Sequence, residues 1–461
     1  MLARWSARFD ALVARFPWLT SALAWSIYAV GVVWRWFHVV KDHDPRDHVY
    51  SDMEIYVGLA KRLADPGYHL SISDVTHPPG VTTLLASIYA RDPSLQTAVY
   101  VQFVVCALAP LVIGGLGRFA FGKGNGKAAL AVASLYFPFV DYGGYFLAEI
   151  YMILTMPLWV MLLLVASRQG KIGLMLLLGA LAGFVFSVAM ALKALALPAL
   201  LCFLLVYFVF WHGPPRKRRA LVVAALAIGS LPLVVWQCAR CTTANNGKFC
   251  PGSNKAASDF LMGHYGRFNM MTWHDPVTGE TRMFGSPSTA QHGYTERPEM
   301  DFGITDSKKN IETALGWIRQ HPIQTITLTG EHIYDLYFGS VAWPSSATRY
   351  WVGAAQANYA FVLLMLLPAS VRCIDLLRIR GLRGFLGSTE ALVLSPVVGL
   401  IVSAAIATGE PRYRIPFDSL YMIVALEFFA DWKRAKKSSP ATTPLDDEPS
   451  GLLGDPSRSR L

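Results

Sequence analysis

Residues 172–190 read IGLMLLLGALAGFVFSVAM, a run of apolar and small residues without a single charge. A helix of about 20 apolar residues crosses the hydrocarbon core of a bilayer, so this stretch predicts a transmembrane helix. The whole chain extends the pattern, because 53% of its 461 residues are hydrophobic and only 16% are charged. A soluble protein cannot bury so much apolar surface, and the composition therefore indicates a membrane protein with many spans.

Further apolar runs predict an all-α polytopic membrane protein with about ten transmembrane helices. The other runs are residues 17–37, 94–117, 128–146, 150–167, 191–211, 219–237, 355–372, 389–408 and 416–431. Two long segments between runs, 38–93 and 238–354, are expected to carry amphipathic helices on one face of the membrane. Within the second, residues 252–306 are rich in Gly, Asn, Ser and Pro, which predicts a loop. Residues 323–343 are apolar but contain three ionisable side chains, which favours a helix at the interface over an additional span.

The charges of the loops predict the orientation of the chain. Lys and Arg cluster near residues 4–15, 122–127, 168–171, 214–219, 378–383 and 433–437. With ten spans all these clusters fall on one side, which the positive-inside rule makes cytoplasmic. Both termini are then cytoplasmic, segments 38–93 and 238–354 face outward, and a bacterial inner membrane is the expected location. The net charge of +10 follows from this orientation and does not indicate nucleic-acid binding.

The two ends of the chain are expected to lie outside the membrane domain of residues 17–431. Residues 1–16 place apolar side chains at helical spacing opposite arginines, which predicts an amphipathic helix on the cytoplasmic membrane surface. Residues 432–461 are expected to form a disordered cytoplasmic tail, because from 438 onward Ser, Pro and Asp dominate.

Three cysteines, Cys238, Cys241 and Cys250, open the second outer segment. In an oxidising compartment a disulfide to Cys250 is expected, which leaves one thiol over. A zinc site is the alternative, although a fourth ligand is not evident.

A candidate catalytic acid lies just after the first run. Ser51 and Glu54 have the spacing of a capping box, and residues 55–63 have the apolar periodicity of a short helix. Asp52 would occupy the first turn of this helix, where an acid interacts favourably with the helix dipole. The alternative is catalytic, since a general base at the membrane surface can meet an acceptor hydroxyl.

Two ionisable residues border apolar runs. Lys193 follows the run 172–190, and a charge in such a place usually faces an interior or a cavity. The alternative for Lys193 is that its ammonium reaches the interface. Glu149 lies at the turn before residues 150–167, where it can pair with a cation, hold a metal or cap the helix.

Arg412 and Arg414 flank Tyr413 on the predicted outer side, where positive-inside bias makes paired arginines unexpected. The planar guanidinium suits phosphate oxygens. The alternatives are a salt bridge to Glu410 or Asp418 and contact with lipid headgroups.

Together these residues resemble the GT-C class of integral-membrane glycosyltransferases. The most similar branch is the protein mannosyltransferase and aminoarabinose transferase group with its bacterial relatives. The resemblance covers most of residues 17–431 and rests on several short motifs. These are Asp52 with Tyr56, the turn Thr76-His-Pro-Pro-Gly80, Glu149, Lys193 before a proline, and Arg412-Tyr-Arg-Ile-Pro416. The chain departs from the mannosyltransferases in having Asp-Met-Glu in the first loop, and Lys193 stands where Arg is commoner.

The resemblance implies transfer of a sugar from a polyprenyl-phosphate carrier to a hydroxyl of a lipid, glycan or protein at the outer face of the membrane. Asp52 would deprotonate the acceptor, and Lys193, Arg412 and Arg414 would bind the donor phosphate. The substrate-orienting residues would be Glu54, Tyr56, His77, Glu149 and Tyr413. The resemblance assigns no certain cofactor, and the use of a divalent metal is left open. The alternatives are a transporter or flippase of lipid-linked sugars and a noncatalytic envelope assembly protein.

Overall fold

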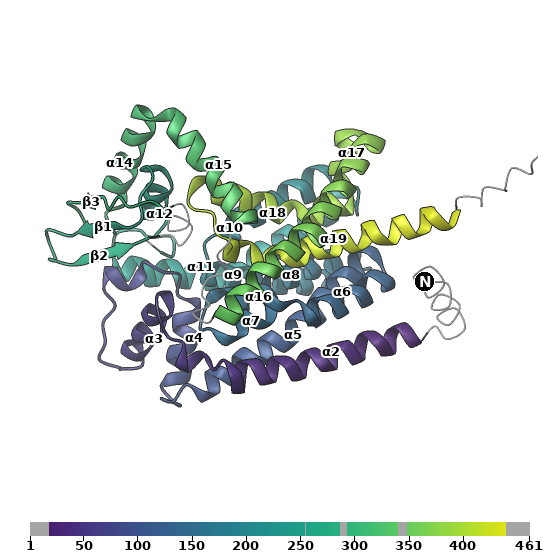
Figure 1. The fold of residues 1–461 in the computed structure, drawn as a ribbon, viewed down its shortest axis with the longest axis horizontal. Coiled ribbons are helices and arrows are strands. Elements are labelled where there is room, and N and C mark those ends of the chain that lie inside the picture. The colour runs from purple at the N-terminus through teal and green to yellow at the C-terminus, as the bar shows by residue number, and fades with distance from the viewer. Residues whose placement is uncertain (1–17, 254, 286–292, 340–347, 439–461) are drawn as a thin grey trace, which may run out of the picture.

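The computed structural model describes residues 18–253, 255–285, 293–339 and 348–438. Long helices form a bundle, and short helices with a three-stranded sheet form a cap over one end of it (Figure 1). The predicted class, an all-α polytopic membrane protein, is therefore confirmed. The helix expected at 1–16 and residues 439–461 of the expected tail lie outside the described residues.

Seven helical segments of the described chain are long and apolar enough to cross a membrane. They are Leu19–Asp47, Gln96–Phe121, Ala148–Arg168, Ile172–Leu192, Arg216–Ala244, Ala355–Leu386 and Thr389–Ile406. All the predicted runs are helical over most of their length. Three of them, however, are too short or too charged to count among the seven.

These three runs differ from the prediction for separate reasons. In 128–146 the helix α6 (Lys123–Leu135) ends at an extended Tyr136, and Pro138 opens the short helix α7 (Phe137–Asp141). In 191–211 the helix α10 (Ala196–Leu205) continues only through the π-helical turn η5 (Val206–Phe210), so the segment is shorter than 18 residues.

Run 416–431 belongs to α19 (Pro411–Ser438), which carries Asp418, Glu427 and Asp431. Asp418 is fully buried, in line with the rule that charges within a membrane bundle face its interior. The helix extends through Ser438, past residue 432 where the tail was expected to begin.

The centre of the bundle is formed by α8 (Ala148–Arg168) and α19, which pack against each other and are buried over most of their length. Around them lie α2 (Leu19–Phe37), α5 (Gln96–Phe121), α9 (Ile172–Leu192), α11 (Arg216–Ala244) and α18 (Thr389–Ile406). The outer helices expose large apolar side chains such as Val33, Leu177 and Ile228. Such a surface suits contact with lipid chains rather than water.

Helices α9 and α11 approach so closely that glycine is required between them. A Cβ atom added at Gly183 would lie 1.9 Å from the Leu226 carbonyl oxygen, and one at Gly229 would lie 1.9 Å from that of Ala180. Small residues at helix contacts let backbones pack directly, which is the usual source of helix association in membranes.

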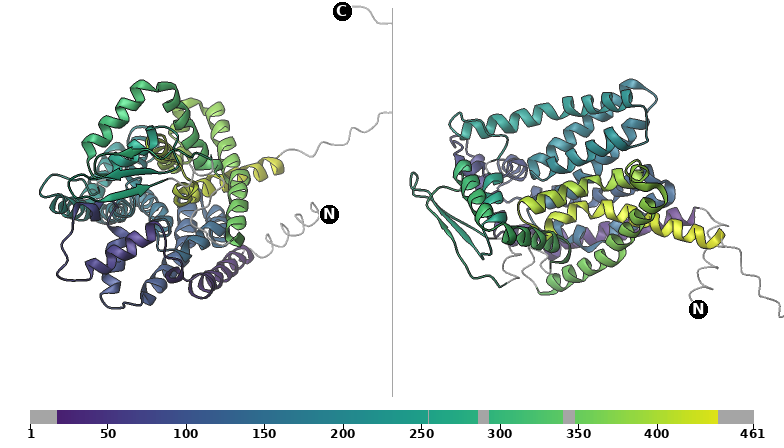
Figure 2. Two further views of the ribbon diagram at one scale, coloured as in Figure 1. Left: turned by 60° about the vertical axis from the view of Figure 1, so that its left-hand side comes forward. Right: turned by 90° about the horizontal axis from the view of Figure 1, so that it is seen from above.

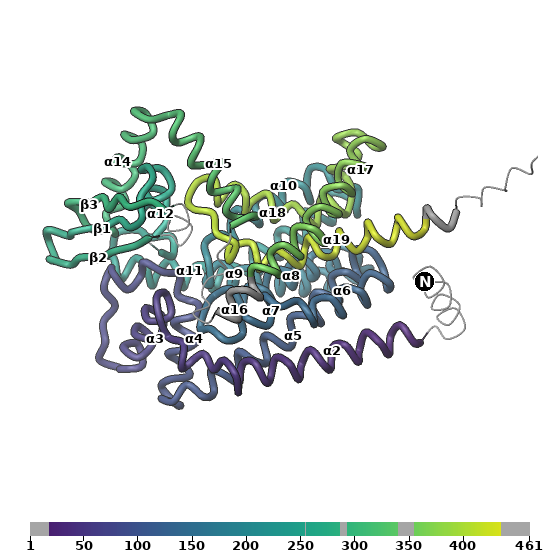
Figure 3. The backbone as a smooth tube through the Cα atoms, in the orientation of Figure 1, coloured from purple at the N-terminus to yellow at the C-terminus, as the bar shows by residue number. Residues whose placement is uncertain are grey.

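The start of α2 and the end of α19 lie at the end of the bundle opposite the cap (Figures 1 and 2). The basic segments 122–127, 168–171, 214–219 and 378–383 also lie there, and we call this the arginine-rich end. After α16 (Thr348–Phe361), the π-helical turn η6 (Val362–Leu366) and α17 (Leu367–Leu386) run along the bundle toward this end (Figure 3). The position of these basic segments at one end of the bundle agrees with the prediction that they share one side of the membrane.

The cap is built from the two long segments. The first gives η1 (His38–Asp42), η2 (Pro45–Asp47), α3 (Asp52–Leu63), η3 (Ile72–Val75) and α4 (Gly80–Tyr89). The second gives α12 (Lys255–His264), β1 (Met271–His274), β2 (Thr281–Phe284), β3 (Glu299–Met300), α14 (Ser307–Gln320) and α15 (Pro322–Phe338). Within 323–343, α15 carries Glu331, His332 and Asp335 and is not among the candidate spans.

The sheet and α12 correct the expectation that residues 252–306 form a loop. Strand β1 lies in the middle of the sheet, antiparallel to β2 and parallel to β3. Its side chains Met271 and Trp273 are buried with Leu261 of α12 and Ala314 of α14. The strands are short, and their packing against two helices supplies the apolar burial that an isolated hairpin lacks.

Candidate functional site

A cluster of charged side chains lies where the cap meets the helix bundle. Arg412, near the start of α19, donates from Nη1 to Oδ2 of Asp52 at 3.1 Å, and its Nε lies 2.6 Å from Oε2 of Glu410. Lys193, the residue that ends α9, forms an ion pair with Glu149 in the first turn of α8. The structure thus brings the predicted acid together with two of the three predicted phosphate-binding cations.

Tyr413 joins the two ion pairs. The Lys193 Nζ lies 4.1 Å from the centre of the Tyr413 ring, and the Arg412 guanidinium carbon lies 5.0 Å from it. Arg412 Nη2 also donates to the Tyr413 hydroxyl at 3.2 Å. Cations over an aromatic face are attracted to it, so Tyr413 helps to hold both side chains in one place. We call Asp52, Glu149, Lys193, Lys255, Asp259, Glu410, Arg412 and Tyr413 the polar cluster.

Lys255 and Asp259, one helical turn apart on α12, complete the polar cluster and are absent from the residues predicted from the sequence. Burial lowers the pKa of Lys255, but Asp259 and Asp52 outweigh this effect and raise it, so Lys255 is a cation. Burial raises the pKa of Asp259 despite the neighbouring Lys255. Their i, i+4 spacing is visible in the chain, but it has meaning only in a helix, and the sequence predicts a loop there.

Asp52 is held in its ionised form. Burial by itself would raise the pKa of Asp52, but Arg412, followed by Lys255, His77 and Lys193, outweighs burial and holds this pKa below its usual range. A carboxylate surrounded by cations in a poorly solvated place is a frequent property of functional sites.

The capping box predicted for Ser51 and Glu54 is wrong. Ser51 has φ 54° and ψ −129°, and its side chain makes no capping hydrogen bond. A positive φ is uncommon for a residue other than glycine, and backbone strain of this kind clusters at functional sites. The strained residue immediately precedes Asp52, so it sets the position from which that carboxylate reaches Arg412.

The turn that contains His77 packs against the end of α9. A Cβ atom on Gly80 would lie 2.8 Å from the Ala191 carbonyl oxygen, so α4 begins directly beside the segment that presents Lys193. His77 contacts Tyr56 edge to face, with ring centres 5.7 Å apart, and its Nε2 lies 3.5 Å from Lys255 Nζ. Burial, aided by Lys255, lowers the pKa of His77 to about 3, so the imidazole is neutral at ordinary pH.

Two predicted site residues lie apart from the polar cluster. Glu54 is exposed and lines a separate cavity of about 120 Å³ together with His77 and Arg282. Arg414 donates from Nε to Asp418 at 2.8 Å and from Nη1 to Asn358 at 2.7 Å. The structure therefore places Arg414 in the buried salt bridge that was the alternative to phosphate binding.

A divalent metal does not fit the polar cluster as it is arranged. The described residues contain no group of three or more potential metal ligands. Asp52 and Glu149 are each bound to a cationic side chain, so a metal ion would have to displace Arg412 or Lys193.

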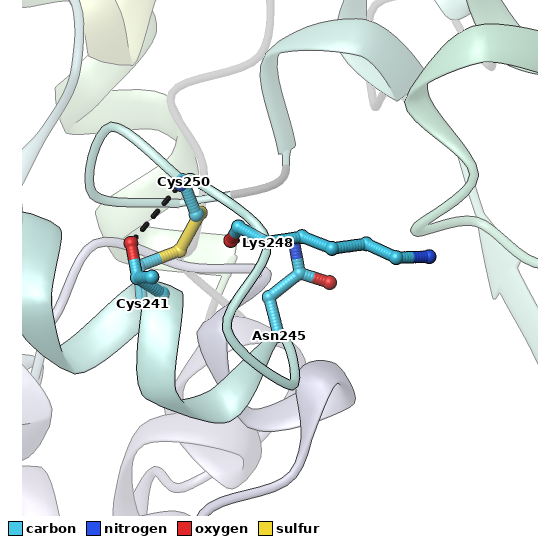
Figure 4. Close-up of a disulfide and its surroundings, with 5 residues drawn as sticks. Cys241, Asn245, Lys248 and Cys250 are labelled. Carbon is cyan, nitrogen blue, oxygen red and sulfur yellow. Dashed lines mark hydrogen bonds between the residues drawn. A yellow bond between two sulfur atoms is a disulfide. The ribbon is translucent and has the colours of Figure 1, made fainter.

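The disulfide prediction is confirmed. Cys241, near the end of α11, is bonded to Cys250, with Cα atoms 5.3 Å apart, and Cys238 is the thiol left over (Figure 4). Within the closed loop, the Cys250 amide donates to Thr242 Oγ1 at 3.2 Å and Asn245 Nδ2 donates to the Lys248 carbonyl at 3.3 Å. The disulfide fixes Cys250, five residues before Lys255, to the end of α11.

No protein-family model matches this chain, and no curated protein matches it. Among solved structures it is similar to the oligosaccharyltransferase AglB from Archaeoglobus fulgidus in complex with an inhibitory peptide and a dolichol-phosphate. That alignment has a TM-score of 0.50 and 11% identity, and it covers 92% of this chain and 53% of that one. The apo form of the A. fulgidus enzyme gives a TM-score of 0.50 with 12% identity, and covers 91% of this chain and 52% of that one.

The chain spans about half the length of these structures. At such low identity the similarity concerns the fold alone. It does not single out the mannosyltransferase and aminoarabinose transferase group expected from the sequence.

Proposed function

We propose that this protein is a membrane glycosyltransferase that moves a sugar from a polyprenyl-phosphate carrier to a hydroxyl acceptor. The observation that carries the proposal is the Asp52–Arg412 pair, set among further cations at the capped end of a GT-C-like bundle. The similar AglB structure, which contains a dolichol-phosphate and an inhibitory peptide, supports a lipid phosphate as the donor's carrier.

The donor phosphate binds by exchanging partners with Asp52. Arg412 presents a planar fork that suits two phosphate oxygens, and Lys193 and Lys255 add point charges beside it. In the described structure these cations face Asp52, Glu149 and Asp259. An incoming phosphate competes for the same cations, so it loosens the hold of Arg412 on the Asp52 carboxylate.

This exchange makes Asp52 a better base. A neighbouring negative charge raises the pKa of a carboxylate, and a general base works best when its pKa approaches the working pH. Asp52 takes the proton of the acceptor hydroxyl while the acceptor oxygen forms a bond to the anomeric carbon. The bond from that carbon to the phosphate oxygen breaks, and its electron pair leaves with the lipid phosphate. Fixed cations stabilise the charge that develops there.

The acceptor approaches from the cavity of about 120 Å³ beside His77. His77 lies between this cavity and Lys255, and its neutral ring can exchange hydrogen bonds with a hydroxyl group. Tyr56 orients the His77 ring from the other side. The lining is polar, and its two acids, Glu54 and Asp74, balance its two arginines, Arg62 and Arg282, a composition suited to a polar, uncharged acceptor.

The capped end faces out of the cytoplasm in this proposal. The arginine-rich end lies at the opposite end of the bundle, and positive-inside bias directs such loops to the cytoplasm. A reporter fused after Gly252 should be active outside the cytoplasm, whereas one fused after Lys171 should be active inside.

The decisive experiment uses the purified full-length protein with synthetic polyprenyl-phosphate sugars. Asp52→Asn should lower turnover by about 10²–10⁴-fold, the usual contribution of a general base, while donor binding remains. Asp65→Asn is the matched control, because it makes the same chemical change at an exposed position after α3. Full activity in Asp52→Asn would remove Asp52 as the base. Movement of an intact lipid-linked sugar across vesicles without hydrolysis or transfer would favour the flippase.

A further inference from the structure

A second cavity lies at the arginine-rich end of the bundle. It has a volume of about 770 Å³ and lies between the end of α8, the turn leading into α11, and the junction of α17 and α18. Its cationic lining comes from three separate elements, as Arg168, Arg218 and Arg380. The 21 residues of α8 separate it from Glu149, a distance of roughly 30 Å at 1.5 Å per residue. The cavity therefore lies at the membrane face opposite the polar cluster.

The walls of this cavity are fixed by hydrogen bonds. Arg219 is buried and donates from Nη1 to the carbonyl oxygens of Tyr207 at 2.6 Å and Trp211 at 2.9 Å. The His212 amide donates to the Gly387 carbonyl at 3.2 Å, which ties the turn before α11 to the start of α18. The Ser167 hydroxyl, near the end of α8, lies 2.5 Å from the Tyr207 hydroxyl, so the ends of all three helices that carry the arginines are held around one space.

The arginines of the lining carry charge that no acid balances. Glu390, the acid in the lining, accepts a hydrogen bond from Arg372 at 2.8 Å. Across the part of the chain that the structure describes, no carboxylate lies within ion-pair distance of Arg168, Arg218 or Arg380. Positive-inside bias explains why arginines occur at this end, but not why three of them surround one cavity.

Apolar surface adjoins the charged lining. Trp211 and Phe121 line the cavity itself. Leu205 and Phe208, in the helical segment that leads to Trp211, are 56% and 41% exposed. A soluble anion would gain nothing from such a surface, whereas the acyl chains of a lipid would pack on it. Basic pockets between transmembrane helices on the cytoplasmic side suit the headgroups of anionic lipids.

We propose that this cavity binds the headgroup of an anionic phospholipid, with the phosphate on Arg168, Arg218 and Arg380 and the acyl chains along η5. Such a lipid would add a further link between the ends of α8, α11 and α17, which hydrogen bonds already hold together. Its binding is separate from the proposed transfer reaction at the other end of the bundle.

The test measures lipid retention by native mass spectrometry of the purified full-length protein with added phosphatidylglycerol or phosphatidylcholine. The wild type should retain phosphatidylglycerol in preference to phosphatidylcholine. A triple variant, Arg168→Gln with Arg218→Gln and Arg380→Gln, should bind phosphatidylglycerol about tenfold more weakly or worse, because each cation near a membrane surface contributes appreciably to anionic lipid binding. The matched control removes three equally exposed cations of the same end that do not line the cavity, through Lys171→Gln, Arg216→Gln and Arg383→Gln. It should bind like the wild type.

A second variant guards against misfolding of the triple variant. Replacing the same three arginines by lysine keeps the charge that directs insertion but removes the planar fork, and it should weaken retention by a smaller factor. Unchanged retention in both variants, or an equal loss in the matched control, would overturn the proposal. Thermal stabilisation by inorganic phosphate as strong as that by phosphatidylglycerol would overturn the assignment to a lipid.

Discussion

Arg412 and Arg414 are separated by one residue of α19, yet they lie in two different regions of the molecule. Arg412 joins the polar cluster, where its partners come from α3 and from the residue before α19. Arg414 is fully buried against Asp418 of its own helix and against the ring of Phe361 at 3.7 Å. Side chains two positions apart on an α-helix point about 200° away from each other. Arg412 therefore faces the polar cluster, while Arg414 packs on the opposite side of α19.

The largest effect, on the free energy of unfolding, is expected from breaking the buried ion pair of Arg414 and Asp418. Arg414→Gln leaves the Asp418 carboxylate without its cation, which should lower the free energy of unfolding by about 3–5 kcal/mol. Thermal unfolding in detergent measures this loss. Replacing both partners, by Arg414→Met and Asp418→Leu, should recover most of it. Wild-type stability in Arg414→Gln combined with lost turnover would instead assign Arg414 to the donor phosphate.

Arg412→Gln should show the opposite pattern. Its partners are closer to the solvent of the site than those of Arg414, and its proposed role is to stabilise charge as the phosphate leaves. We expect kcat/KM to fall by about 10²–10³-fold, the usual cost of losing one such charged donor. The change in melting temperature should be smaller than in Arg414→Gln. Equal losses of stability in the two variants would remove the distinction between the regions.

The pH dependence of turnover sharpens the role of Asp52. Its pKa lies below the usual range in the free protein, so kcat/KM should stay flat between about pH 5 and 8. Bound donor phosphate should raise the pKa of Asp52 in the complex. Because kcat reports the complex and kcat/KM the free protein, kcat should decline at a higher pH than kcat/KM as the medium is acidified. Steady-state kinetics extended below pH 5 measure both acid limbs. Coincident acid limbs would mean that the donor does not displace Arg412 from Asp52.

Whether His77 stays neutral in the folded protein can be tested from the pH dependence of stability, without an activity assay. The unfolded chain binds a proton at this position below about pH 6.5, whereas the folded protein keeps His77 neutral down to a pKa of about 3. Because the unfolded state binds more protons in this window, stability rises with pH across it, by at most about 1.4 kcal/mol per pH unit. His77→Gln should remove this part of the slope in melting temperature between pH 7 and 5. Parallel curves would show that the folded protein protonates His77.

The membrane bundle follows from the sequence because an uncharged run of about 20 apolar residues is seldom stable outside a bilayer. Asp52, Lys193 and Arg412 were singled out in the sequence as charges at the edges of apolar runs or near the membrane surface, and the structure brings them into one cluster. Arg412 could not be separated from Arg414, since that depends on which face of α19 meets the neighbouring helices. Lys255 and Asp259 were hidden because their segment is rich in turn-forming residues and gains its order only by packing on β1 and α14.

The bond between Cys241 and Cys250 has a consequence for handling the protein. Residues 246–249, with Lys248 among them, are exposed on the outside of the closed loop. Trypsin that cuts after Lys248 would leave two fragments joined through sulfur, and they would migrate as one band until a reductant is added. The tether that positions Lys255 would survive the cut, so nicked material could keep an intact site.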